Sequence, residues 1–426
     1  VHKAIPFGLQ HILAMFVANI APILIVGGAC GLAASDMAML IQSAMLIAGI
    51  GTLVQLFPIF HKIGSGLPIV MGISFTFLAA CLATASQDYG IMVGAIIVGG
   101  CFEGILGLTA KYWRRLISPI VSACVVVSIG LSILNVGVSS FGSSSAYPLG
   151  SWQNLLVATI TLAAALVFHT TLKGVAKQLY VLLGMMVGYV VSIFFGMVDF
   201  AGMGSTIREL GIVAVPQLFA FKPQFQLGAI LSFCLVFIVS AVETIGDTTA
   251  CCTGGLGRDI TVEEISGSLC VDGFASALSG GVFGCSPITS FSQNVGLISM
   301  THVVNRFTIM FGALAMILGG LFPPIGAFFT TLPDCVLGGC TVIMFGSIMM
   351  SGIRMMYDAG MTPRNTLIAA TSICIGVGVT QVEGFFDQMP AFIGDIFAGN
   401  MVAGVFVVGL ILDICLPRDP SRYESM

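Results

Sequence analysis

Charge is what this sequence has least of. Only 8% of its 426 residues are charged, whereas 57% are hydrophobic. Soluble globular proteins carry about 25% charged residues, and a chain this apolar has too few polar side chains to cover a core in water. The composition therefore excludes a soluble enzyme and a disordered protein. Because the net charge of −4 offers no attraction for nucleic acid, we also expect no nucleic-acid partner. The chain has the composition of a polytopic membrane protein.

Motifs for metal and redox chemistry are absent as well. The sequence has 13 cysteines but no C-x-x-C pair, and none of its 5 histidines begins an H-E-x-x-H motif. This excludes the common zinc and thioredoxin-type sites. Most of the cysteines lie inside apolar runs, where a thiol packs as a small hydrophobic group. We expect no metal and no cofactor.

Long apolar runs dominate what is present. A membrane-spanning helix needs about 20 apolar residues. Two of the candidate runs are poor helices, because 67–84 contains Pro68 and Gly72, and 286–300 is short, polar and contains Pro287. The fourteen candidate runs are 10–33, 38–60, 67–84, 90–110, 117–138, 153–171, 178–199, 228–247, 266–284, 286–300, 305–329, 333–352, 366–382 and 392–416.

The basic residues predict the orientation. With the N-terminus on the cytoplasmic side, 13 of the 15 Lys and Arg residues fall in cytoplasmic loops, and only Arg208 and Lys222 fall outside. This is the distribution that the positive-inside rule describes. We therefore expect an even number of spans and both termini in the cytoplasm. The membrane that we expect is a bacterial-type inner cell membrane.

The two poor helices resemble each other. The first reads Pro68-Ile69 and then Ser74-Phe75, and the second reads Pro287-Ile288 and then Ser290-Phe291. They are the third and tenth runs, so an odd number of spans separates them and they face opposite ways. Paired broken segments at matching positions of two halves indicate a transporter whose site lies near the middle of the membrane.

Carboxylates inside apolar runs are costly and are candidates for function. Glu243 and Asp247 stand four residues apart, so they share one helix face. Two such carboxylates cannot both ionise cheaply in a medium of low dielectric constant, which favours a proton-linked site. Internal hydrogen bonding is the alternative for this pair. Asp272 and Glu103 suit either a functional or a structural role equally. Asp413, near the cytoplasmic end of its run, suits a side chain that reaches to the membrane surface or caps a helix.

Polar side chains crowd the tenth run, from Ser286 to Thr301. They cannot face lipid. Pro287 suits the start of a helix, whose N–H groups would point into the site. The amide of Gln293 matches the N–H and C=O edge of a nucleobase, and Phe75 offers a flat wall for a ring. His11, after Gln10 in the first run, is either a contributor or a structural residue.

These residues resemble the nucleobase–ascorbate transporter family, also called nucleobase–cation symporter-2, and its xanthine/uric acid permease branch. The family motif Q/E/P-N-x-G-x-x-x-x-T-R/K/G fits Gln293-Asn294-Val295-Gly296 through Thr301 and departs only at His302. The Gln-His pair of the family stands at 10–11 and its acidic stretch at 243–247. The departure at His302 leaves the range of substrates open.

The resemblance implies an all-α polytopic membrane protein with 14 transmembrane segments in two inverted seven-span repeats. Short antiparallel β-strands would lie in the broken spans 3 and 10. The implied domains are a core formed by 1–116 and 228–330 and a gate formed by 117–227 and 331–426. Relatives often form homodimers through the gate domain, so we expect a homodimer.

The resemblance also implies the function: proton symport of xanthine or uric acid by alternating access, with the proton as coupling ion. Gln at the first motif position favours an oxidised purine, whereas uracil permeases tend to carry Glu there. The expected substrate-binding residues are Ser74, Phe75, Glu243, Phe291, Ser292 and Gln293. The residues expected to support proton coupling or the site are His11, Asp247, Asp272 and Asn294.

Three alternatives stay open. One is a permease for uracil or another nucleobase. Another is an anion transporter or channel of the same architecture, which would need a cation at the site, although Arg306 lies beyond it. The third is a membrane-embedded enzyme, which would need a nucleophile with its base, or a metal-binding set, within the spans.

Overall fold

The computed structural model describes residues 4–60, 62–113 and 118–417, and most of them are helical. In the first part of the chain the elements are α1 (Ala4–Ala29), α2 (Ala34–Leu56), β1 (Met71–Ile73), the 3-10 helix η1 (Phe75–Phe77), α3 (Leu78–Ala85), α4 (Tyr89–Leu108), α5 (Ala110–Trp113), α6 (Pro119–Ser132), α7 (Leu134–Gly142), α8 (Trp152–Thr171), α9 (Val175–Gln178), α10 (Tyr180–Phe194) and α11 (Phe200–Leu210). The second part contains α12 (Leu227–Ala250), the π-helix η2 (Cys251–Leu256), α13 (Val262–Gly281), β2 (Ile288–Ser290), α14 (Ser292–Thr301), α15 (Arg306–Gly320), α16 (Pro323–Phe329), α17 (Asp334–Asp358), α18 (Pro363–Gln381), α19 (Ala391–Phe397) and α20 (Met401–Cys415).

Several helices begin where the sequence carries a capping signal. The side chain of Thr261 accepts a hydrogen bond from the backbone of Glu264, whose carboxylate accepts one from the backbone of Thr261, which is a capping box at the start of α13. Thr362 caps α18 directly before Pro363, a residue well suited to the first helical turn. Such caps satisfy backbone N–H groups that have no partner inside the helix.

Seven helices among the described residues are long and apolar enough to cross a membrane, and α15 with α16 forms a further pair bent by 83°. The seven are Phe7–Ala29, Ala34–Leu56, Tyr89–Leu108, Pro119–Gly142, Trp152–Thr171, Leu227–Leu256 and Asp334–Asp358. The chain is therefore a multi-pass membrane protein. Five basic residues used to predict its orientation, and both termini, lie outside the described residues: Lys3, Arg114, Arg115, Arg418 and Arg422.

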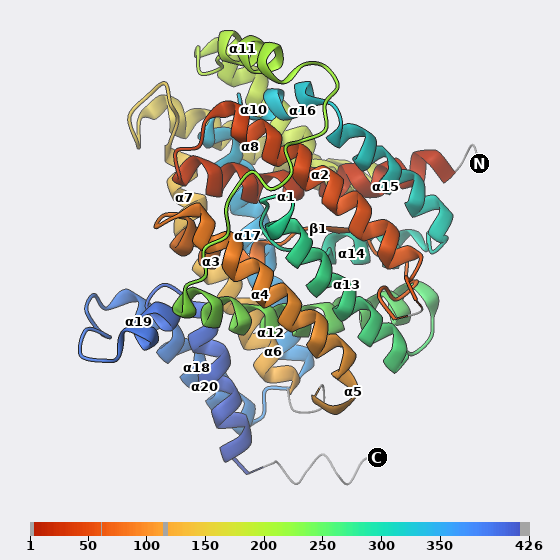
Figure 1. The fold of residues 1–426 in the computed structure, drawn as a ribbon, viewed down its shortest axis with the longest axis vertical. Coiled ribbons are helices and arrows are strands. Elements are labelled where there is room, and N and C mark those ends of the chain that lie inside the picture. The colour runs from red at the N-terminus through yellow and green to blue at the C-terminus, as the bar shows by residue number, and fades with distance from the viewer. Residues whose placement is uncertain (1–3, 61, 114–117, 418–426) are drawn as a thin grey trace.

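The helices pack in two groups. In the first packing group, α4 lies against α12 and α13, while α15 lies against α1 and α2. In the second packing group, α17 lies against α6, α7 and α8, and α20 lies against α6 and α18. Figure 1 shows α18 and α20, in dark blue, at one end of the molecule and α11 at the opposite end. Helices far apart in the sequence thus form each group.

A two-stranded antiparallel sheet lies near the middle of the molecule (Figure 1). In its register, Met71 pairs with Ser290, Gly72 with Thr289 and Ile73 with Ile288. Two further backbone bonds extend the pairing, from the N–H of Ser74 to the Pro287 carbonyl and from the N–H of Phe291 to the Val70 carbonyl, each 3.0 Å long. The strands occupy the two segments that the sequence marks as poor helices.

The prediction that Pro287 starts a helix is wrong. Pro287 precedes β2, and α14 begins only at Ser292. A proline lacks an N–H but keeps its carbonyl, so Pro287 can accept the bond from Ser74 at the end of the sheet without leaving a donor unpaired. The helix N-terminus consequently lies five residues further along the chain than the proline suggests.

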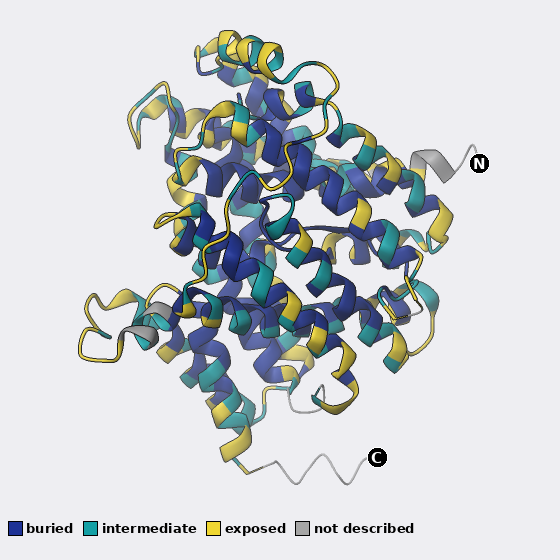
Figure 2. Cartoon of the chain, viewed as in Figure 1, coloured by how far each residue is buried: buried dark blue, intermediate teal, exposed yellow. Residues whose placement is uncertain are grey.

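Burial separates an inner and an outer surface (Figure 2). Buried residues gather on the inward faces of the helices, and exposed residues gather on outer faces and connecting loops. On α10, Met186, Val190 and Phe194 form one exposed apolar stripe at helical spacing, and the Phe194 side chain is 84% exposed. Large apolar side chains in such a stripe are suited to contact with lipid tails.

Glycines bring α4 and α13 into close backbone contact. A Cβ atom added at Gly273 would overlap the Gly104 nitrogen and would lie 2.6 Å from the Gly100 oxygen. On the α4 side, a Cβ at Gly100 would lie 2.6 Å from the Ala277 nitrogen. Only glycine permits this approach, because small residues let helix backbones touch within a membrane.

We predict that Gly273→Ala destabilises the folded protein, because the added methyl group meets backbone atoms that cannot move aside. The expected loss is about 1–3 kcal/mol in the free energy of unfolding. Gly378→Ala on α18 is the matched control, since no atom lies within 4 Å of the added Cβ there. The measurement is thermal unfolding of both variants in detergent. Equal melting temperatures would contradict the close-packing argument.

Candidate functional site

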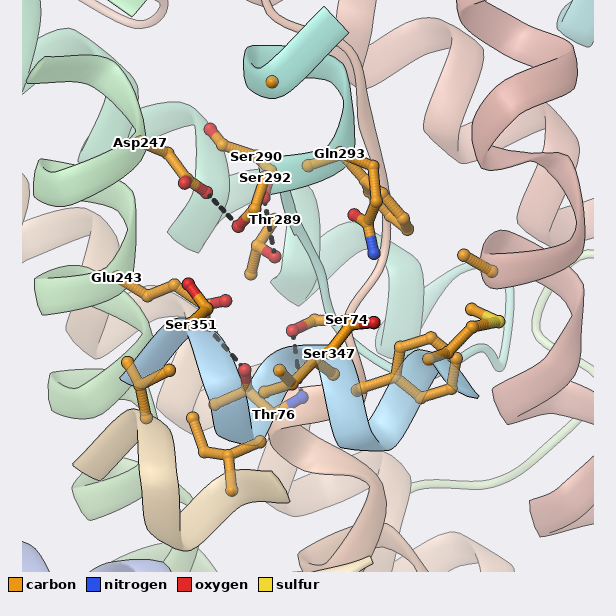
Figure 3. Close-up of a pocket in the computed structure, with 18 of the residues that line it drawn as sticks. Ser74, Thr76, Glu243, Asp247, Thr289, Ser290, Ser292, Gln293, Ser347 and Ser351 are labelled. Carbon is orange, nitrogen blue, oxygen red and sulfur yellow. Dashed lines mark hydrogen bonds between the residues drawn. The ribbon is translucent and has the colours of Figure 1, made fainter. Parts of the chain in front are cut away.

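A cavity of about 570 Å³ lies between the two packing groups, next to the sheet. Both strands run into short helices whose N-termini face it: η1 and α3 follow β1, and α14 follows β2 (Figure 3). The described residues that line the cavity are Ala14, Val17, Ala18, Ile73, Ser74, Phe75, Thr76, Val126, Ile129, Gln178, Tyr180, Val181, Glu243, Gly246, Asp247, Ala250, Thr289, Ser290, Phe291, Ser292, Gln293, Gly296, Met344, Ser347, Ile348, Ser351 and Met355.

Two carboxylates of α12 face this cavity, as their spacing predicts. Glu243 Oε2 accepts a hydrogen bond of 2.6 Å from the Thr76 hydroxyl, directly after β1. Asp247 Oδ2 accepts one of 2.8 Å from the Ser292 hydroxyl, directly after β2. Figure 3 shows the two contacts as dashed lines. Each carboxylate of α12 is therefore tied to a different half-helix.

Asp272 lies behind the sheet rather than in the cavity. It is fully buried on α13, and its carboxylate accepts bonds from the Thr244 hydroxyl and from the backbone N–H and hydroxyl of Ser290. The Ser290 contacts measure 3.3 Å from the nitrogen and 3.4 Å from the hydroxyl. An ionised carboxylate only accepts, and this set of donors suits it. Asp272 thus holds β2, and with it the start of α14, against α12 and α13.

Asn294 connects three elements. Its side-chain oxygen accepts a 2.9 Å bond from the N–H of Val70, which precedes β1, and its Nδ2 lies 2.7 Å from Nδ1 of His11. Because an amide nitrogen only donates, His11 Nδ1 is the acceptor and carries no proton. Asn294 and His11 are both 1% exposed. Neither side chain lines the cavity, and together they hold α14 against α1 and the first broken segment.

Gln293 points the other way, into the cavity (Figure 3). Neighbouring residues of a helix diverge by about 100°, so the buried Asn294 leaves Gln293 facing the open space. The Gln293 side chain is exposed and makes no hydrogen bond to any described residue. Its carbonyl and amide groups are thus available to a ligand.

Two aromatic rings border the same space. Phe75 and Phe291 both line the cavity, and each is 5% exposed. The Phe75 ring meets Phe345 of α17 at a centroid distance of 5.3 Å and an interplanar angle of 78°. This edge-on contact orients the Phe75 ring. It joins the broken segment that carries Phe75, on the side of the first packing group, to α17 of the second packing group.

The predicted site residues therefore fall into two sets. Lining the cavity are Ser74, Phe75, Glu243, Asp247, Phe291, Ser292 and Gln293. Buried behind it are His11, Asp272 and Asn294. The structure brings all ten to one region, while their individual roles stay predictions.

Sequence reasoning missed the part of the lining that α17 contributes. Ser347 and Ser351 belong to the lining of the cavity (Figure 3). They stand four residues apart in an apolar helix, a spacing that places two hydroxyl groups on one face and could have identified them. Thr76, the partner of Glu243, was also missed, because that contact joins residues far apart in the sequence.

The lining has a definite electrostatic character. Glu243 and Asp247 are its only ionisable carboxylates, and no described Lys or Arg belongs to it. Among the described residues, no three His, Cys, Asp or Glu side chains gather as a possible metal centre. The side chains that line the cavity can therefore form hydrogen bonds, pack against a ring and exchange protons at the two carboxylates.

Comparison with known proteins identifies the family. A family model described as "Permease family" matches residues 2–385. Xanthine permease XanQ of Escherichia coli (strain K12) is 33% identical over 434 residues, covering 98% of this chain and 91% of the relative. The xanthine permease of Bacillus subtilis (strain 168) is 33% identical over 421 residues, with 97% and 93% covered. The putative purine permease CPE0397 of Clostridium perfringens (strain 13 / Type A) is 32% identical over 429 residues, with 99% and 92% covered.

Solved structures share the fold at low sequence identity. The transmembrane domain of a cyanobacterium bicarbonate transporter, BicA, superimposes with a TM-score of 0.58 and 13% identity, covering 97% of this chain and 98% of that one. The murine anion transporter Slc26a9 in its inward-facing state gives a TM-score of 0.60 and 12% identity, covering 97% and 68%. At this identity the likeness concerns the fold alone.

Family membership rests on the whole chain rather than on one motif. The family match and the xanthine permease relatives both span the sheet, both half-helices and the carboxylates of α12. The chain belongs to the permease family, in the xanthine/uric acid permease branch of the nucleobase–ascorbate transporters, and it is a transporter and not an enzyme.

Proposed function

We propose that this protein is a secondary active transporter that imports a purine nucleobase, xanthine or uric acid, by proton symport with alternating access. The observation that carries the proposal is the cavity itself. It combines a free amide at Gln293, carboxylates at Glu243 and Asp247, and rings at Phe75 and Phe291. Relatives at 31–33% identity that cover nearly the whole chain are named xanthine permeases.

The shape and chemistry of a purine suit this space. Small-molecule sites enclose roughly 300–1,000 Å³ and place a few polar groups among apolar walls, and this cavity of about 570 Å³ has that make-up. Xanthine presents alternating N–H and C=O groups at its edge. Gln293 pairs with both kinds, and Glu243 accepts from an N–H. The faces of the ring would pack against the phenyl groups.

Proton coupling would use the same carboxylates. Glu243 and Asp247 are one helical turn apart, and each accepts a single serine or threonine hydroxyl. Uptake of a proton by one of them removes the repulsion between two negative charges and favours binding of a neutral base. Because each contacts a different half-helix, a change of charge would act on both broken segments. Movement of one packing group against the other would then expose the site to alternate sides.

We further propose fourteen spans in two inverted repeats. Support comes from the order of the elements, since each of the fourteen apolar runs contains a helix or a strand followed by a helix. The antiparallel pairing of β1 with β2 also favours inversion, because equivalent segments of inverted repeats run in opposite directions. The first packing group draws its helices from 1–116 and 228–330, which supports a core domain; the second draws from 117–227 and 331–426, which supports a gate domain.

The distribution of basic residues supports an orientation with both termini in the cytoplasm. The similarity to an Escherichia coli permease supports an inner cell membrane location. The partners of the protein would then be the lipid bilayer and the purine. The homodimer expected from the resemblance stays a prediction, which the mass of the detergent-solubilised particle would test.

A second candidate is an anion transporter, because the solved structures that share the fold transport bicarbonate or other anions. The cavity argues against it, since the described lining contains two carboxylates and no cation. Thermal unfolding of the purified protein would decide the matter, with xanthine, uric acid, uracil, bicarbonate and sulfate as ligands. Stabilisation by a purine supports the proposal, whereas stabilisation by an inorganic anion alone would overturn it.

We predict that Glu243→Gln abolishes proton-coupled xanthine uptake, because the amide cannot take up a proton and cannot accept as a charged group. The measurement is uptake of labelled xanthine into cells or proteoliposomes at several pH values. Glu209→Gln, at an exposed position of α11, is the matched control and should behave as the wild type. Full uptake by the Glu243 variant would refute the assignment.

We also predict that Gln293→Ala weakens xanthine binding roughly 5- to 30-fold, the effect of losing a hydrogen-bonding group worth about 1–2 kcal/mol. Gln293→Glu should weaken xanthine more than uracil, because it replaces the donor of the amide by an acceptor. A competition panel of nucleobases against labelled xanthine measures both effects, with the exposed Gln388→Ala as control. Unchanged competition profiles would show that Gln293 does not contact the base.

A further inference from the structure

One buried carboxyl group belongs to no part of the site described so far. Glu103 lies on α4, is 0% exposed and does not line the cavity. Neither of its carboxyl oxygens has a hydrogen-bond partner among the described residues. Buried polar groups are nearly always paired, so an unpaired acid at this depth calls for a physical explanation.

Its surroundings connect it to the site. The glycines of α4 bring its backbone against α13, and the backbone carbonyl carbon of Glu103 is 2.8 Å from where a Cβ at Gly273 would lie. Asp272 is the neighbour of Gly273 in the chain and, with Glu243 of α12, is close enough to act on Glu103 electrostatically. Cys270 of α13 is the further titratable group that faces Glu103. The Ser240 hydroxyl of α12 also faces it, but the two do not form a hydrogen bond in this structure, and Ser240 Oγ is buried with no partner among the described residues.

Asp272 and Glu103 differ in what surrounds them. Asp272 accepts hydrogen bonds from Thr244 and Ser290, a set of donors that stabilises an anion. Glu103 has only the Ser240 hydroxyl nearby and forms no hydrogen bond with any described residue, and an ionised carboxylate with so few donors is disfavoured in a buried position. In this conformation the surroundings therefore favour the proton on Glu103 over Asp272.

We propose that Glu103 is a proton-holding residue of the transport cycle, which exchanges its proton with Asp272 at the junction of α4, α12 and α13. The inference rests on the proposed function, because it assumes proton-coupled transport. It adds a site for the proton that lies behind the substrate cavity, away from the carboxylates that face the purine.

The step balances as a simple proton transfer. The O–H bond of the Glu103 carboxyl breaks, an O–H bond forms on the Asp272 carboxylate, and the negative charge moves to Glu103. The unpaired Ser240 hydroxyl then donates to the new anion. Asp272, once neutral, accepts less strongly from the N–H and hydroxyl of Ser290, so β2 and the start of α14 are held less tightly. The position of one proton is thereby linked to the geometry of the substrate-facing half-helix.

A bound metal cation explains the unpaired Glu103 carboxyl group less well than a proton does. The backbones of α4 and α13 approach so closely that even a methyl group at Gly273 would overlap them. A proton needs no such room.

The decisive variant is Glu103→Gln, which keeps the shape of the neutral acid but cannot release a proton. Reconstituted into liposomes, it should still bind xanthine, as shown by thermal stabilisation, and should still exchange internal for external xanthine. Net uptake driven by an inward proton gradient should be lost. Glu209→Gln, an exposed acid on α11, is the matched control. A wild-type ratio of protons to xanthine in Glu103→Gln would overturn the proposal and leave Glu103 as a structural neutral acid.

A spectroscopic measurement keeps the proposal testable without transport. Infrared difference spectra of the wild type, with and without xanthine, should contain the C=O band of a protonated carboxylic acid. That band should be missing in Glu103→Gln and shifted in Ser240→Ala, and the serine variant alone suffices if the glutamine variant does not fold. A band unchanged in both variants overturns the proposal. Stabilisation by sodium in the wild type but not in Glu103→Gln would also overturn it, in favour of a cation site.

If the wild type neither binds xanthine nor responds to a proton gradient, the proposed function fails instead. In that case, infrared spectra of the wild type recorded at varied pH would still contain the carboxylic-acid band. Its loss in Glu103→Gln would still assign the proton to Glu103. The two failures are thus distinguishable.

Discussion

The constraint on which the rest of this structure depends is the pairing of backbone polar groups at membrane depth. An interrupted helix leaves N–H and C=O groups that lipid cannot satisfy. Here the two interruptions satisfy each other through β1 and β2, and side chains complete the pairing: Thr52 Oγ1 accepts from the N–H of Met71 and Asn19 Oδ1 from that of Ile73, at 2.9 and 2.8 Å. On the other strand, the Ser276 hydroxyl donates a hydrogen bond of 2.7 Å to the Ile288 carbonyl. The sheet is thus possible only because distant helices present matching polar groups.

The site follows from that arrangement. Once the strands pair, two helix N-termini are brought to the same place, and the positive ends of their dipoles favour polar and anionic partners there. The hydroxyl groups that begin these half-helices meet the carboxylates of α12, and Asn294 ties one half-helix to the segment before β1. Polar residues that look scattered along the sequence therefore belong to one connected network, and the cavity is the space that this network leaves open.

How much of this could be predicted from the sequence differs between local and long-range features. The proline and glycine interruptions, the spacing of Glu243 and Asp247, and the motif at Gln293 are local patterns, and each lies in a segment that borders the cavity. The start of α14 at Ser292 could not be read from the position of Pro287, because the intervening residues form a strand only in the presence of β1. The bond from the N–H of Val70 to Asn294, across 224 residues, leaves no local signal at all. The contribution of α17 was missed because two serines in an apolar helix are compatible with several roles.

The contact between Phe75 and Phe345 has a mechanical consequence. The two rings belong to different packing groups, so any sliding of one group past the other must separate them. An edge-to-face aromatic pair is worth about 0.5–1.5 kcal/mol beyond its buried area, and that amount resists sliding while the cavity is empty. If the groups move as proposed, a planar ligand lying against the Phe75 ring would take the place of the lost neighbour and lower that resistance. The ring pair would then stabilise the unloaded carrier in this conformation more than the loaded one, which would disfavour movement without substrate.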